Sequence, residues 1–249
     1  MKLSRFIALP MIVAGMFVST AHAQKLKSFF ENTDSSFTWL GVDFTQTRLL
    51  GDNAANAADI VDRHFIGIND VVLNEPKKYD IAGAFHRKSV ANDLSAVSKH
   101  NAATNKESLK SDNSADATRL KPEDIARLVK AYDYGGKKGI GVIFFMESMN
   151  KSEKEASMYV TVVDMATRNM LMTERMTGKA KGFGFRNYWA FSVHDVMDDV
   201  SSNYKKWKEK YAEAKDPEPE PAPAPAKKEV KTAVAAKEVK EAKKAKKKS

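Results

Sequence analysis

The segment from Lys138 to Gly182 restricts the possible folds more than any other, because it predicts three consecutive β-strands. Gly139–Met146 is apolar on both of its alternating faces, a pattern typical of a strand that is covered on both sides. Met158–Asp164 is rich in β-branched residues, and Met170–Thr177 alternates between two sets of side chains. Polar linkers join the strands, so the segment predicts an antiparallel meander that needs helices on at least one face.

Four further segments have the apolar spacing of regular elements. Phe37–Leu50 predicts a first strand, which the Gly-Asp-Asn turn after it ends. Ala57–Asn74 has apolar residues at the spacings of one helical face, and a second helix begins at Lys121-Pro122. Tyr188–Ala214 carries an apolar stripe over many turns and predicts the longest helix.

Two segments between these elements are harder to interpret. Lys88–Val97 fits a second strand, parallel to the first, slightly better than it fits a helix, and the helix remains open. Asn101–Thr118 contains almost no apolar side chain and predicts a mobile loop. The predicted fold is α/β (α+β), with one mixed sheet that ends in the three-stranded antiparallel meander and is packed by about three helices.

The N-terminus predicts export. Lys2 and Arg5 precede the apolar run Phe6–Val18, and Ser19–Ala23 offers the small residues that a signal peptidase reads, so cleavage is expected before Gln24. The absence of cysteine excludes a lipidated N-terminal cysteine and any disulfide. We expect a periplasmic protein, with a secreted or extracellular protein as the alternative.

Charge and composition divide the chain into parts. The formal charge of +9 separates into +2 in residues 1–23 and +7 in residues 227–249, which leaves residues 24–226 neutral. Specific nucleic-acid binding is therefore not expected of the folded part. The predicted parts are a signal peptide (1–23), an N-terminal arm (24–35), the α/β domain (36–214), a Pro-rich spacer (215–226) and a disordered Lys-rich tail (227–249).

The turn between the last two predicted strands has the pattern D-x-x-T, with Asp164 and Thr167 placed to accept backbone hydrogen bonds. It lies in a series of segments, which are TWLGVDFTQTRLL, GIGVIFFME, YVTVVDMATRNML, GKAKGFG and YWAFSVHDVMDDV. Their order over residues 38–208 resembles the small α/β domain of periplasmic accessory proteins: the curli secretion lipoprotein, the lipoprotein activators of penicillin-binding proteins and the N-terminal domain of the Tol translocation protein. The resemblance implies a non-enzymatic docking module. This chain departs from those families in having Arg168 where glycine is common, and in lacking the lipidated cysteine.

The Gly-rich bend before the longest helix contains the candidate binding residues. Cations and aromatic rings surround a predicted helix N-terminus, where exposed amides favour an anion. The residues are Lys179, Lys181, Arg186, Tyr188 and Trp189. We expect them to recognise an anionic glycan or a partner carboxylate; the alternative is a bend whose aromatic residues pack into the core.

The C-terminal tail is the second candidate for binding. Its lysines predict a salt-dependent attraction to an anionic polymer or lipid surface, and the Pro-rich spacer would extend their reach. A tail that only keeps the protein soluble is equally compatible with the composition. The lysines at its end are Lys243, Lys244, Lys246, Lys247 and Lys248.

Nothing in the sequence assembles a catalytic or metal site, and we expect no cofactor. His194 stands beside Asp195, but helical neighbours point about 100° apart and cannot form a dyad. We interpret the remaining carboxylates, Asp43 among them, as solvated caps and helix surfaces. The predicted function is that of an exported, non-enzymatic envelope accessory protein with an envelope protein or peptidoglycan as partner. The alternatives are an envelope glycan hydrolase with paired carboxylates and an unspecific binder of anionic polymer or nucleic acid.

Overall fold

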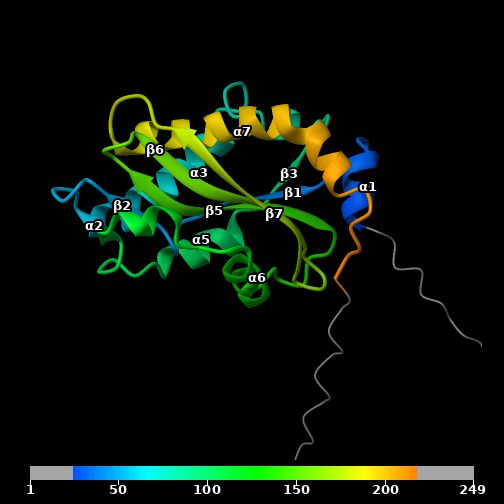
Figure 1. Cartoon of the computed structure of the whole chain (residues 1–249), viewed down its shortest axis with the longest axis horizontal. Helices are drawn as coiled ribbons and strands as arrows, with labels where there is room; N and C mark the ends of the chain where they lie inside the picture. The colour runs from blue at the N-terminus through cyan, green and yellow to red at the C-terminus, as the bar shows by residue number, and fades with distance from the viewer. Residues whose placement is uncertain (1–24, 218–249) are drawn as a thin grey trace, which may run out of the picture. The chain divides into compact units, whose positions relative to one another are not determined.

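Strand β5 (Ile140–Asn150) is the centre of the computed structural model, which describes residues 25–217. One edge of β5 pairs in parallel with β1 (Thr38–Asp43) and then with β2 (Arg48–Leu50). The other edge pairs antiparallel with β6 (Glu155–Asp164), and β6 pairs antiparallel with β7 (Asn169–Lys179). β5 is apolar on both faces because strands flank it on both edges and helices cover it on both faces (Figure 1).

Two short strands complete the seven-stranded sheet of the described residues. β3 (Ala91–Asn92) lies parallel to β1, and β4 (Lys110–Ser111) lies parallel to β2. Four strand pairs are therefore parallel and two antiparallel within residues 25–217. The predicted α/β class is confirmed, and more of the sheet is parallel than the sequence predicted.

Helices cover both faces of the sheet, and there are more of them than the three predicted (Figure 1). One face, the α7 face, carries α1 (Lys25–Glu31), α3 (Phe65–Asn74) and α7 (Phe185–Lys210). The other, the α6 face, carries α5 (Ser95–Ala102) and α6 (Pro122–Ala131). α2 (Ala57–Asp59) and the π-helical turn η1 (Ile60–His64) run without a break into α3, so the helix predicted for Ala57–Asn74 is confirmed. α4 (Ile81–Ala84) and the 3₁₀ turn η2 (Ser114–Thr118) are single turns between the other elements.

The two faces of the sheet bury separate apolar clusters. Successive side chains of a strand point to opposite faces, so Val142 and Phe144 of β5 pack under α7, while Ile143 and Phe145 pack under α6. The cluster under α7 is the larger and is rich in aromatic rings. The stripe of α7 lies in it, as its periodicity indicates.

The segments Phe37–Leu50 and Lys88–Val97 differ from their predictions. The first is divided into β1 and β2, because a turn with a hydrogen bond from Thr47 N to Phe44 O (3.0 Å) interrupts it. In the second, only β3 is a strand, parallel to β1 as predicted, and α5 begins at Ser95. The strand prediction for Lys88–Val97 is thus wrong over most of its length.

The segment Asn101–Thr118, predicted to be a mobile loop, contains the end of α5 and the short elements β4 and η2. The side chain of Asn101 is buried; its Oδ1 accepts a hydrogen bond from Phe44 N (2.7 Å) and its Nδ2 donates one to Val42 O (2.9 Å). Leu109 is buried as well, and β4 and η2 follow it. A polar composition therefore conceals an ordered segment, because an asparagine can take the place of a strand neighbour by bonding to the open backbone of β1.

The two ends of the described chain meet beside the β6–β7 turn. Lys25 Nζ lies 2.6 Å from Asp164 Oδ2, and Asp216 accepts a hydrogen bond from Leu26 N (3.2 Å). α1 packs in the core under α7, so the domain begins before the predicted boundary at residue 36. The predicted signal peptide (1–23), residues 218–226 of the spacer and the Lys-rich tail (227–249) lie outside the described residues.

Candidate functional site

The bend between β7 and α7 is shaped by its glycines. Gly182 and Gly184 have φ angles of 118° and 73°, which residues other than glycine rarely adopt. Phe183, held between them, is 94% exposed. A Cβ atom on Gly178 would lie 2.2 Å from the carbonyl oxygen of Ser192, so glycine is also needed there for β7 to approach α7. The chain thus reverses direction and presents one aromatic side chain at its tip.

The predicted binding residues lie around this tip in two groups. Lys179, Lys181 and Arg186 are exposed and can reach a partner. Tyr188 is half-buried, and Trp189 is 1% exposed because it lies on the apolar stripe of α7. Trp189 can therefore contribute only to the wall of a binding pocket and cannot contact a partner with its whole ring. We refer to residues 178–191, together with the two hollows on either side of Phe183, as the bend surface.

The first hollow, the aromatic pocket, has a volume of about 560 Å³. Its wall is made by Phe183, Phe185, Tyr188 and Trp189. The ring of His64 lies 4.9 Å from that of Phe185, and the ring of Tyr188 meets that of Trp189 edge to face at 5.0 Å. Pockets of this size with aromatic walls suit an apolar or ring-shaped group of a ligand.

Two carboxylates line the aromatic pocket, and both are paired with cations. Asp52 lies 2.8 Å from Lys151, and Asp59 lies 2.8 Å from Arg63 and 3.2 Å from His64. A glycan hydrolase needs one carboxyl group that can donate a proton and another that is open to the sugar or to water. Carboxylates that are each held by a cation do not fit these roles.

The second hollow, the lysine pocket, has a volume of about 360 Å³ and shares Phe183 with the first. Lys78 Nζ and Lys181 Nζ lie 5.6 Å and 5.8 Å from the centroid of the Phe191 ring, so two cations flank one aromatic wall. Within residues 25–217, no carboxylate forms an ion pair with Lys78, Lys179, Lys181 or Arg186. Glu75 also lines the lysine pocket but forms an ion pair with neither lysine, so the pocket holds two lysines and one carboxylate and keeps a small excess of positive charge.

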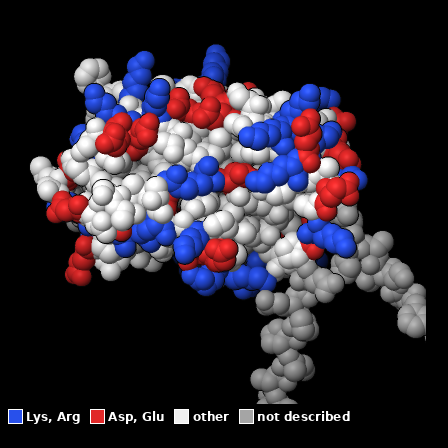
Figure 2. Space-filling model, in the orientation of Figure 1, with Lys and Arg blue, Asp and Glu red and all other residues white. Residues whose placement is uncertain are grey.

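Figure 2 shows basic and acidic side chains side by side over one face of the domain, with no broad area of a single sign. The charged lining of the lysine pocket is only Glu75, Lys78 and Lys181, so its excess of positive charge is local. A local excess suits a carboxylate of a protein partner better than the long phosphate track of a nucleic acid.

No protein-family model and no curated protein matches this chain. Its function must therefore be inferred from its own geometry. Among residues 25–217, no helix has the length and apolarity to cross a membrane. Nor do His, Asp and Glu side chains gather there in a group that could hold a metal ion.

One buried polar cluster was missed at the sequence level. Asp43, interpreted as solvated, is buried at the end of β1, where it accepts hydrogen bonds from Thr45 N (2.7 Å), Thr45 Oγ1 (2.6 Å) and Tyr132 Oη. Burial, and next the charge of Asp43, raise the pKa of Tyr132. His100 Nδ1 lies 3.7 Å from the same carboxylate. Since these residues are far apart in sequence, no local pattern predicts the cluster, and its satisfied hydrogen bonds fit a structural role.

Proposed function

We propose that this chain is exported to the periplasm and acts there as a non-enzymatic interaction protein, docking on an envelope protein through the bend surface. Phe183 is the single observation that carries the proposal. An aromatic side chain that is 94% exposed gives a partner a large apolar area to bury, and aromatic residues of this kind dominate the energy of many interfaces.

The backbone around Phe183 supports this role. Gly182 and Gly184 allow the turn, and backbone hydrogen bonds from Lys181 N to Tyr188 O (3.2 Å) and from Tyr188 N to Gly184 O (3.0 Å) close it, which reduces the order that binding has to impose. Hollows on both sides leave room for the walls of a recess in the partner. The side chain is therefore shaped to insert into another molecule.

The charges around the tip specify the partner further. Lys78, Lys179, Lys181 and Arg186 have no ion-pair partner within residues 25–217, and the positive end of the α7 dipole lies at the same place. A partner with an apolar recess and a rim of carboxylates would complement both features. We therefore propose an acidic surface of an envelope protein and not the glycan of peptidoglycan.

The placement of the chain ends agrees with docking by a tethered domain. The 26 residues of α7 span about 39 Å at 1.5 Å per residue. The bend surface lies at the start of α7, whereas Pro217 bonds to Asn169 and Asp216 to the start of α1, which lies at the other end of α7 (Figure 1). Attachment of the Lys-rich tail to an anionic polymer or lipid surface, which we also propose, would leave the bend surface accessible.

Site-specific photo-crosslinking in cells tests the docking proposal. A photoreactive phenylalanine analogue at position 183 of the full chain should yield a discrete adduct with an envelope protein. The same analogue at Lys208, exposed near the other end of α7, is the matched control and should not give that adduct. Reversal of charge by Lys181→Glu and Arg186→Glu should abolish the adduct at position 183.

Three results would overturn the docking proposal. They are the absence of an adduct at position 183, the same adduct at position 208, and an adduct that persists unchanged after charge reversal. Adducts with peptidoglycan fragments alone would replace the protein partner by a glycan.

Sedimentation with isolated cell envelopes tests the tail. The full chain should sediment at low salt and be released as salt increases, because exposed charges are screened. A chain ending at Pro217 keeps every described contact and should remain in solution. Equal sedimentation of both proteins would show that the tail does not anchor the domain.

A further inference from the structure

A third hollow lies on the α6 face and is smaller and more polar than those of the bend surface. It has a volume of about 280 Å³, and its polar lining comes from Gln46, Arg119, Asp124 and Arg127. Arg127 pairs with Asp124, so these two charges largely neutralise each other. Arg119 has no carboxylate partner within the described chain.

Arg119, which lines this hollow, forms a like-charge pair with Arg48. Both side chains are partly buried, and their polar partners are backbone carbonyls: Arg48 Nη1 donates to Thr47 O (3.2 Å), and Arg119 Nη2 donates to Gln46 O. Burial, and next the charge of Arg119, lower the pKa of Arg48, while the charge of Asp116 opposes them.

The guanidinium of Arg119 is also incompletely bonded. Its Nε is buried and has no hydrogen-bond partner among the described residues. A buried donor without a partner is rare in folded proteins, and a concentration of unpaired positive charge beside it is unfavourable. A negatively charged group in the hollow would offset the positive charge, and it could accept a hydrogen bond from Arg119 Nε once the side chain turns toward it.

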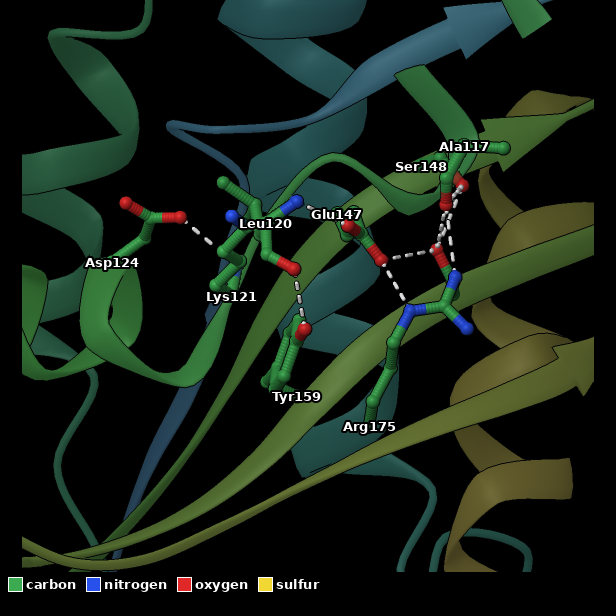
Figure 3. Close-up of polar contacts among 9 residues, drawn as sticks. Ala117, Leu120, Lys121, Asp124, Glu147, Ser148, Tyr159 and Arg175 are labelled. Atoms are coloured by element: carbon green, nitrogen blue, oxygen red, sulfur yellow. Dashed lines mark hydrogen bonds and ion pairs between the residues drawn. The ribbon is translucent and has the colours of Figure 1, made fainter. Parts of the chain in front are cut away.

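The backbone that carries Arg119 is fixed on both sides, as Figure 3 shows. Before it, Ala117 O accepts hydrogen bonds from Ser157 Oγ (3.0 Å) and Arg175 Nη2 (2.9 Å). After it, Leu120 O accepts one from Tyr159 Oη (2.6 Å). Arg119 is thus held on an anchored segment, and little movement is needed for it to bind a ligand.

Asp116 is the carboxylate whose charge acts on Arg48, and its Oδ2 accepts a hydrogen bond from Ser111 Oγ (2.6 Å). Glu147 is a second, buried carboxylate close to Leu120, and its contacts commit it elsewhere (Figure 3). Its Oε1 accepts a hydrogen bond from Leu120 N (2.7 Å), and its Oε2 accepts from Arg175 Nε (2.7 Å) and Ser157 Oγ (3.1 Å). Its charge is therefore compensated by Arg175. Neither Arg48 nor Arg119 forms an ion pair within residues 25–217, and the charge of Asp116 offsets their repulsion only in part.

We propose that the hollow at Arg119 binds a small oxyanion, either a phosphate or a carboxylate. The planar guanidinium of arginine matches two oxygens of such a group, and the hollow is large enough for a small ion. This site lies on the opposite face of the sheet from α7. It does not depend on the docking function proposed for the bend surface.

Thermal unfolding of the full chain at constant ionic strength tests the site, with sodium phosphate or sodium acetate replacing sodium chloride. Saturating phosphate or acetate should raise the Tm of the wild-type protein by about 3 °C. The ion that raises the Tm at the lower concentration shows whether the site prefers a tetrahedral phosphate or a planar carboxylate. Isothermal titration calorimetry with the same two ions measures binding directly.

Three variants separate binding at this site from a general effect of anions. Arg119→Gln should lose the rise in Tm, whereas Arg63→Gln, the matched loss of an exposed arginine, should keep it. Arg48→Gln should melt no lower than wild type in chloride, because the repulsion from Arg119 is gone, and should melt lower than wild type in phosphate.

The proposal is overturned if neither ion raises the wild-type Tm, or if all variants respond as the wild type does. Near-UV circular dichroism checks that Arg119→Gln is folded. If Arg119→Gln does not fold, the Tm values of Arg48→Gln and wild type decide. The proposal is contradicted if Arg48→Gln melts lower than wild type in chloride as well as in phosphate.

Discussion

The two faces of the sheet are stabilised in different ways. The α7 face buries an extensive cluster of apolar and aromatic side chains, with Phe44 stacked on Phe65 at 4.2 Å between ring centroids. The α6 face has a smaller apolar cluster and buries the carboxylates of Asp43 and Glu147; the α7 face also buries polar side chains, Asn69 and Arg87 among them. Apolar packing depends on shape and area, whereas buried polar groups depend on the presence of each partner. The α7 face should therefore be most sensitive to the loss of buried apolar volume, and the α6 face to the loss of a single polar partner.

The largest effect should come from the apolar packing under α7. Phe65→Ala removes a fully buried ring and should lower the free energy of unfolding by about 4 kcal/mol. The adjacent Ile66 is 50% exposed, and Ile66→Ala should change it by no more than about 0.5 kcal/mol. Urea unfolding of the three proteins measures both. Similar losses for both variants would show that packing does not distinguish the buried from the exposed side of α3.

A polar substitution on the α6 face should have a smaller but still large effect. Glu147→Gln keeps the size of the side chain but leaves Arg175 without its counter-ion, which should cost about 2 kcal/mol. Glu153→Gln, at an exposed position, is the control and should be nearly neutral in urea unfolding. If both glutamines prove harmless, the proposed dependence of this face on buried charge is wrong.

The smallest effect should appear at Asp164, which lies where the chain ends meet. Burial by itself would raise the pKa of Asp164, but hydrogen bonds from Lys25 and Thr167 outweigh it and lower the pKa below its ordinary value of 3.8. A lowered pKa means that the ionised carboxylate stabilises the fold above pH 3.8, and that this contribution is lost as the pH falls through the lowered value.

Asp164→Asn should therefore reduce stability at neutral pH by about 1 kcal/mol, through weakened hydrogen bonds. Its stability should also fall less steeply than that of the wild type when the pH drops below 3.8. Urea unfolding at several pH values between neutrality and strong acid measures both slopes. Parallel curves for the two proteins would show that Asp164 does not contribute to the acid sensitivity.

The difference between the α7 face and the α6 face also explains which parts of the fold could be predicted from the sequence. Under α7 the apolar periodicity is complete, so α3 and α7 follow from it. On the α6 face, Asn101 is buried because it bonds to the backbone of β1, and a buried asparagine looks the same in sequence as a solvated one. That is why a segment with buried contacts was predicted to be a mobile loop.

The candidate sites could likewise be predicted only where their residues are neighbours in the sequence. The lysines of the bend could be predicted because glycines, cations and a helix start are neighbours in sequence. Trp189 was included for its aromatic ring, but it lies four residues before Val193 on the buried stripe, and this spacing indicates a core position. Arg48 and Arg119 are distant in sequence and approach only where β2 and η2 meet on the sheet, so no local pattern joins them.

The meeting of residues 25 and 217 at one corner also determines how the protein can be re-engineered. A short peptide linker from Pro217 to Lys25 would close the domain into a ring without crossing either face of the sheet. New ends could then be opened at Gly135 and Gly136, two exposed residues between α6 and β5. Such a circular permutant would retain every strand pairing and the exposed Phe183, but its chain would begin and end between α6 and β5.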